Sequence, residues 1–222
     1  SFEDSLMARM TLLVLGLILL IPSSALANTL TLEATQEFGG GTPPAGDIPW
    51  VRATFDDTGK TQSVDLRFEA LNLTGSEHVG GLYLNLNPAF DASGLAFFPI
   101  EKHGDFVSPV ISLGNDAFKA DGDGKYDLYF EFATTGNDQD RFGPGDWFNL
   151  GIGSTTGLDL TAPAFSFESA PDGNSGPFYM AARIEGIGPN NASAWIATPE
   201  PSSCALAMLA LIGLCVVGRP KC

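Results

Sequence analysis

An acidic stretch in the middle of the chain has the residue types and spacing of a calcium-binding loop. It reads Asp121-Gly122-Asp123-Gly124-Lys125-Tyr126-Asp127. Calcium takes about six to eight oxygen ligands, so carboxylates two residues apart with glycine between them suit a backbone that curls round the ion. We therefore expect Asp121, Asp123 and Asp127 to be metal ligands, with Ca²⁺ as the cofactor.

The same residues also fit an acidic, hydrated β-turn in which Asp and Gly serve turn geometry alone. The position two residues before Asp121 is acidic in fuller calcium loops, but here it is Lys119, whose charge weakens cation binding. A second acidic stretch, Asn137-Asp138-Gln139-Asp140-Arg141, either adds ligands near Asp127 or forms a solvated loop whose charge Arg141 partly offsets. The calcium loop and the plain turn therefore remain alternatives.

The sequence gives little support to nucleophilic or zinc-dependent catalysis. The chain has two histidines, His78 and His103, and contains neither G-x-S-x-G nor H-E-x-x-H. Both histidines fall in predicted loops, where we expect them to be exposed. We therefore assign no catalytic residue. Glycoside hydrolysis stays open, because two of the many acidic residues would suffice as an acid and base pair.

Short β-strands are the elements expected to position these residues. Residues 63–71 alternate so that Val64, Leu66, Phe68 and Ala70 share one face, and residues 126–132 alternate in the same way. Gly, Pro, Asn and Asp separate about ten such segments, and no amphipathic helix is predicted. The fold class is therefore predicted as all-β, an antiparallel β-sandwich with a jelly-roll-like arrangement.

The remaining predicted strands are shorter or less regular. We expect a long loop over 101–115 that contains one strand at 110–113. The other strands are predicted at 30–35, 50–55, 82–86, 95–98, 147–152, 165–168, 178–187 and 194–197. Aromatic side chains on these strands are expected to lie mostly in the core, with Tyr83 and Tyr129 as candidates for stacking on carbohydrate.

The beginning of the chain has the features of a secretory signal peptide. Met7 or Met10 is the natural start, Arg9 precedes an apolar run at 11–21, and Ala25-Leu26-Ala27 matches a signal peptidase site. We predict that residues 1–27 are removed after Ala27. The alternative is a retained core helix, but the run has no polar face.

The end of the chain has three parts, each with a physical role. Pro199-Glu200-Pro201 ends the preceding strand, because proline neither continues a ladder nor allows helix before it. An apolar segment follows, and its 17 residues from Ser202 to Gly218 span about 25 Å as a helix, close to a bilayer core. Arg219 and Lys221 then act as stop-transfer residues on the cytoplasmic side. A buried terminal helix is the alternative.

This order of Pro-Glu-Pro, apolar helix and basic end resembles the PEP-CTERM sorting domain of exported bacterial proteins over residues 199–222. The resemblance implies export, transient tethering by the tail, and processing near the motif by an exosortase of Gram-negative bacteria that make extracellular polysaccharide. The chain departs from the family pattern at its end, where Arg-Pro-Lys-Cys replaces a run of arginines.

Residues 28–198 are left as one domain of 171 residues, enough for a hydrophobic core. Three of the chain's 26 acidic residues and three of its 11 basic residues lie outside it, which leaves 23 acidic against 8 basic and a net charge of −15. Such a surface repels nucleic acid, so nucleic acid is not a partner. Cysteine occurs only at positions 204, 215 and 222, so the domain has no disulfide.

These observations together predict an exported, acidic β-sandwich with a structural or binding role associated with exopolysaccharide. Its partners are expected to be signal peptidase and the export machinery, an exosortase, the membrane through the tail, and polysaccharide. The expected location is first the inner membrane and then the cell surface or extracellular matrix of a Gram-negative-type bacterium. The alternatives are a calcium-assisted carbohydrate-binding module and a polysaccharide-active hydrolase.

Overall fold

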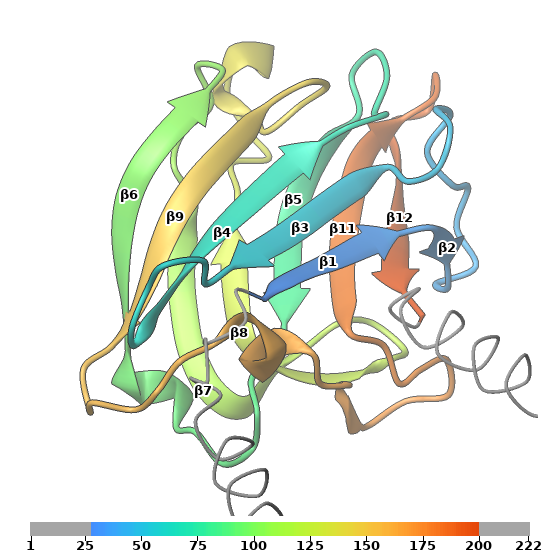
Figure 1. The fold of residues 1–222 in the computed structure, drawn as a ribbon. Helices are drawn as coiled ribbons and strands as arrows, with labels where there is room; N and C mark the ends of the chain where they lie inside the picture. Colours follow the sequence, from blue (N-terminus) through green and yellow to red (C-terminus); the bar gives the residue numbers. More distant parts are fainter. Residues whose placement is uncertain (1–27, 200–222) are drawn as a thin grey trace, which may run out of the picture.

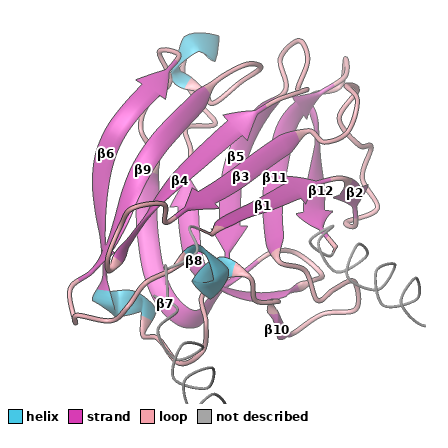
Figure 2. Cartoon of the chain, viewed as in Figure 1, coloured by secondary structure: helices cyan, strands magenta, loops and turns pink. Residues whose placement is uncertain are grey.

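The computed structural model describes residues 28–199, which form an all-β unit (Figures 1 and 2). Twelve strands and three short 3₁₀ helices lie in this part of the chain; the helices are Ala92–Gly94, Asp138–Asp140 and Ala162–Phe165. The predicted signal peptide and apolar tail, with Ala25, Ala27, Glu200, Pro201, Arg219 and Lys221, lie outside the described residues. Within residues 28–199, no helix has the length and apolar character needed to cross a membrane.

The strands form two antiparallel sheets, which confirms the all-β prediction. The five-stranded sheet has the order β1 (Thr29–Ala34), β3 (Val51–Asp56), β4 (Ser63–Ala70), β9 (Trp147–Ser154) and β6 (Leu95–His103). The second sheet has the order β10 (Ala170–Pro171), β8 (Gly124–Glu131), β5 (His78–Leu84), β11 (Met180–Ile187), β12 (Ala192–Thr198) and β2 (Gln36–Glu37). The strand β7 (Val110–Lys119) pairs antiparallel with β8.

The two sheets enclose one hydrophobic core. On β4 the predicted alternation holds, since Val64, Leu66, Phe68 and Ala70 are buried and the residues between them are partly exposed. The ring of Phe68 lies 6.0 Å from that of Phe132, which follows strand β8 of the other sheet. Burial of this apolar area is the main stabilising term for a domain without cysteine.

The two lateral edges of the pair of sheets differ. On one side, the chain passes from β1 in the first sheet to β2 in the second, and the Thr35 amide between them donates to the carbonyl of Ala197 at 3.1 Å. On the other side, β6 and β7 are the outer strands and no pairing joins them (Figure 1). The result is a closed edge opposite an open one.

Several boundaries differ from those predicted. The expected loop over 101–115 contains the end of β6 and the start of a ten-residue β7, because these outer strands are largely exposed and carry no clean apolar alternation. The strand predicted at 165–168 is wrong. A 3₁₀ turn ends at Phe165, and the next strand is the two-residue β10.

Candidate functional site

The three aspartates predicted to bind calcium lie on the β7–β8 turn and on β8, but in different surroundings. Asp121 is exposed at the tip of the turn with a φ of 38°. Asp123 is buried, with 2% of its surface exposed. Asp127 is partly buried on β8. The turn therefore does not present three free carboxylates to one point.

The carboxylate of Asp123 accepts hydrogen bonds from two hydroxyl groups. One comes from Tyr126, and the other comes from Ser169, whose Oγ lies 3.1 and 3.2 Å from the two carboxylate oxygens. Burial raises the pKa of Asp123, and these two hydrogen bonds act against the rise. Burial and the neighbouring carboxylate also raise the pKa of Tyr126. The hydroxyls therefore satisfy a carboxylate that the fold has taken out of water.

Asp127 accepts hydrogen bonds from two backbone amides. Its Oδ2 is 2.8 Å from the amide nitrogen of Leu86, and its Oδ1 is 2.8 Å from that of Asp116. Burial raises the pKa of Asp127, which the two amide bonds oppose. Across residues 28–199, no three His, Cys, Asp or Glu side chains form a group able to hold a metal. Calcium binding by these aspartates stays a prediction.

Two further buried carboxylates also accept backbone amides. Glu77, 2% exposed, accepts from the amides of Ala45 and Thr74, each at 2.7 Å. Asp57 accepts from the amides of Asn28 at 2.7 Å and Ala162 at 2.9 Å. Both carboxylates therefore join segments that are distant in sequence.

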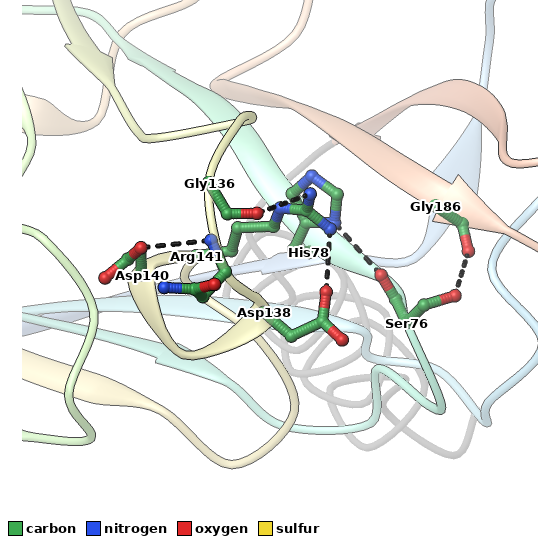
Figure 3. Close-up of polar contacts among 8 residues, drawn as sticks. Ser76, His78, Gly136, Asp138, Asp140, Arg141 and Gly186 are labelled. Atoms are coloured by element: carbon green, nitrogen blue, oxygen red, sulfur yellow. Dashed lines mark hydrogen bonds and ion pairs between the residues drawn. The ribbon is translucent and has the colours of Figure 1, made fainter.

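A polar pocket lies where the start of β5 meets the second half of β11 and the loop after β8. Figure 3 shows His78, Gly186 and Arg141, which come from these three segments. Its volume is about 290 Å³. We call it the His78 pocket, and it is lined by Ser76, His78, Thr134, Arg141, Arg183, Glu185, Gly186, Asn191 and Ser193. The sequence alone does not indicate this pocket, because its residues come from separate segments between positions 76 and 193.

The backbone of β11 shapes one wall of the His78 pocket. The β11–β12 register shifts between Ile184 and Ile187, and Gly186 within this bulge has a φ of 76°. The Ser76 hydroxyl donates to the Gly186 carbonyl at 2.9 Å. A Cβ at position 186 would lie 2.3 Å from the Ser76 carbonyl oxygen, so only glycine allows this approach.

His78 is buried, with 5% of its surface exposed, so the prediction that it is exposed is wrong. Its Nδ1 lies 3.0 Å from the Ser76 carbonyl oxygen. Its Nε2 is buried and has no hydrogen-bond partner among the described residues. His103, by contrast, is exposed as predicted, and its ring stacks on that of Trp147 with 5.8 Å between centroids.

Arg141 lines the same pocket and directly follows the short helix Asp138–Asp140 of the second acidic stretch. Its Nη1 donates to Asp138 at 3.0 Å and its Nη2 to the Gly136 carbonyl at 3.3 Å (Figure 3). Its Nε is buried without a partner in residues 28–199. The ion pair with Asp138 agrees with the interpretation that Arg141 offsets charge in this loop.

The arrangement around His78 does not form a catalytic triad. A nucleophile needs the histidine as its base and a carboxylate to orient that histidine. Here Nδ1 faces a carbonyl oxygen, and the nearby hydroxyl of Ser76 is bonded to Gly186 rather than to the imidazole. The pocket is therefore a candidate site for ligand binding.

The tyrosines considered for carbohydrate stacking belong to a second apolar cluster on the other face of the second sheet. Tyr83 is 8% exposed and its ring stacks on that of Tyr129 at 4.7 Å. Trp195 lies 5.4 Å from Tyr83. The ring of Tyr83 is thus occupied by its neighbours, in agreement with a core role.

Comparison of the chain with family models, with curated proteins and with solved structures found no match.

Proposed function

We propose that this chain is an exported bacterial surface protein whose β-sandwich domain, jelly-roll-like in arrangement, has a structural or binding role in the exopolysaccharide matrix. The signal peptide over 1–27 directs export, and the tail over 199–222 holds the protein at the inner membrane until an exosortase processes it. The mature domain then reaches the cell surface or matrix. The motif Pro199-Glu200-Pro201 and the stop-transfer residues Arg219 and Lys221 support the sorting step.

One structural observation supports a non-catalytic role most directly. The buried carboxylates at positions 57, 77 and 123 all accept hydrogen bonds from backbone amides or from buried hydroxyls. Carboxylates that are buried and paired in this way are not exposed to a substrate. The acidic residues of the interior therefore serve architecture, and a binding role fits the domain better than hydrolysis.

Co-sedimentation tests the binding role. The full chain, purified in a zwitterionic detergent without a sugar headgroup, is mixed with the insoluble matrix polysaccharide of the producing bacterium. The proposal expects saturable co-sedimentation that survives moderate salt. A protein that stays in the supernatant at every polysaccharide concentration contradicts it.

A polysaccharide-active hydrolase is the second candidate, and one cavity favours it. This cavity of about 630 Å³ is lined by Asp116, Asp127 and Glu168 beside the aromatic rings of Phe90 and Tyr179. Burial raises the pKa of Asp127, as a general acid requires. Incubation of the chain with matrix polysaccharide tests this candidate by product analysis. Oligosaccharides released by the wild type and not by Asp127→Asn would support it, and no product would remove it.

The calcium-assisted carbohydrate-binding module makes a different prediction. Its metal would be held by Asp121, Asp123 and Asp127, so calorimetric titration with calcium chloride tests it. Absence of heat and of any rise in melting temperature at millimolar calcium would end this alternative.

A further inference from the structure

Two buried polar atoms in the His78 pocket lack hydrogen-bond partners in the described part of the chain. They are Nε2 of His78, on a side chain with 5% of its surface exposed, and Nε of Arg141. Buried polar groups are nearly always paired, and an unpaired one costs about 1–3 kcal/mol. Both residues line the same pocket, and each of the two atoms exposes less than 1 Å² of surface, so a ligand group reaches them once these side chains shift.

The chemistry of these two atoms is complementary. The Ser76 carbonyl can only accept, so the imidazole nitrogen 3.0 Å away must carry the proton. In the neutral imidazole this leaves Nε2 of His78 as an acceptor, whereas Nε of Arg141 is always a donor. A hydroxyl group donates one hydrogen bond and accepts others, so one hydroxyl is suited to both atoms.

Other residues that line the pocket also offer both hydrogen-bond donors and acceptors. Thr134, Asn191 and Ser193 offer neutral groups that both donate and accept. Glu185 adds an acceptor and Arg183 adds donors. A ligand with several hydroxyl groups meets a partner at each of these positions.

The charges of the pocket favour a neutral ligand. Arg141 is paired with Asp138, and Arg183 is paired with Glu185 at 3.3 Å. Each cation is therefore offset by a carboxylate. The surrounding domain has a net charge of −15 and repels polyanions. A sulfate or uronate group meets no uncompensated positive charge here.

From these observations we infer that the His78 pocket binds a neutral saccharide, with one sugar hydroxyl bridging Nε2 of His78 and Nε of Arg141. The volume of about 290 Å³ suits a single sugar unit at the end or on a branch of a chain. The inferred link to matrix polysaccharide rests on the proposed function. The pocket itself is inferred from its hydrogen-bonding groups alone.

Nitrogen-15 NMR of the imidazoles tests the inference with little overlap, because the chain has only two histidines. The labelled full chain is titrated with glucose, galactose, mannose and rhamnose, and separately with glucuronate and with sulfate. The expected result is a saturable shift of Nε2 of His78 with a neutral sugar, while the nitrogens of His103 stay unchanged. His103→Gln assigns the two sets of signals and serves as an unaffected control.

Arg141→Lys removes the Nε donor and keeps the positive charge. It is expected to weaken sugar binding about tenfold or more, since a hydrogen bond from a charged group is worth about 1.5–3 kcal/mol. The matched control Arg52→Lys, whose guanidinium pairs with Glu33 on the five-stranded sheet, is expected to bind as the wild type does. If Arg141→Lys does not fold, Ser193→Ala on the exposed rim replaces it, with an expected loss of a few fold.

The outcomes separate this inference from the proposed function. No shift with any neutral sugar, an equal shift at both histidines, or a response to glucuronate or sulfate alone would overturn the saccharide site. Matrix co-sedimentation that persists in Arg141→Lys would place polysaccharide binding elsewhere and leave the proposed function standing. Sugar binding without co-sedimentation would support the pocket and contradict the matrix role.

Discussion

The hydroxyl of Tyr126 donates a hydrogen bond to the carboxylate of Asp123 inside the protein. Tyr126 is fully buried and Asp123 is 2% exposed, and the same carboxylate accepts a hydrogen bond from Ser169. The β7–β8 turn is thereby joined to the segment that leads into β10. The spacing of the aspartates in residues 121–127 suggests an ion site. In the structure, however, the Asp123 carboxylate makes hydrogen bonds that stabilise the fold.

Removing this hydroxyl is expected to destabilise the domain. Tyr126→Phe leaves Asp123 with one fewer partner at a buried position, which costs about 1–3 kcal/mol. Chemical denaturation of the two proteins measures the difference in the free energy of unfolding. Tyr129→Phe on the same strand is the matched control: it removes a hydroxyl bonded to Tyr83 at a partly exposed position, where water replaces the lost partner, so it is expected to cost less. Equal losses in the two variants would refute a specific role for the Tyr126–Asp123 bond.

The buried carboxyl of Asp123 makes stability depend on pH in a stated direction. Its pKa is raised from 3.8, so between that value and the folded pKa the native state holds the proton more tightly than the unfolded chain. Stability is therefore lost as pH rises through this window. Asp123→Asn stays neutral and is expected to show a smaller loss of stability as the pH rises above 3.8. Melting temperatures measured across this range check the prediction, and identical slopes would contradict it.

Glu77 is expected to hold two loops in place. Each of its oxygens accepts a backbone amide at 2.7 Å, from Ala45 and from Thr74. In Glu77→Gln one oxygen is replaced by an amide NH₂, a donor that would face another donor, so a loss of about 1–3 kcal/mol is expected. The exposed Glu131→Gln is the control and should stay close to wild type. Thermal melting that shows no difference between the variants would rule out this role.

Alanine substitutions at two glycines in the β11–β12 region distinguish the cost of backbone strain from the cost of a steric clash. Gly186 and Gly188 have φ values of 76° and 62°, so alanine is strained at both. An added Cβ meets the Ser76 carbonyl at 2.3 Å at position 186 and nothing within 4 Å at position 188. Gly186→Ala is therefore expected to cost more free energy of unfolding than Gly188→Ala and to move the NMR signals of His78. Equal effects would show that the contact with Ser76 does not matter.

The sequence predicted the interior strands well, and the physical reason is alternation. On β4 every second residue is apolar and buried, so a period of two is visible from Val64 to Ala70. The outer strands β6 and β7 carry no such signal, because most of their residues are exposed on both faces. The segment at 165–168 looked apolar enough for a strand, but Phe165 reaches the core from a 3₁₀ turn, where its ring stacks on that of Phe55.

The candidate site was much harder to predict. His78 seemed a loop residue because Glu77 and Ser76 precede it, yet it is the first residue of a buried strand. Its neighbours Arg141 and Arg183 lie about sixty and a hundred positions further along the chain, so only the sheet order brings them together. The spacing of Asp121, Asp123 and Asp127 can be read from the sequence. The hydroxyls that bond to Asp123 and the backbone amides that bond to Asp127 cannot.

The central claim is that the chain is exported and processed at both ends, and one measurement tests it most directly. The protein is expressed in a bacterium that makes an exosortase, the cells are fractionated, and the intact mass is determined in each fraction. The account predicts a matrix or cell-surface species that lacks residues 1–27 and has lost the apolar tail near Pro199-Glu200-Pro201, with a membrane-bound precursor before it. A single cytosolic species that retains both ends would contradict the account.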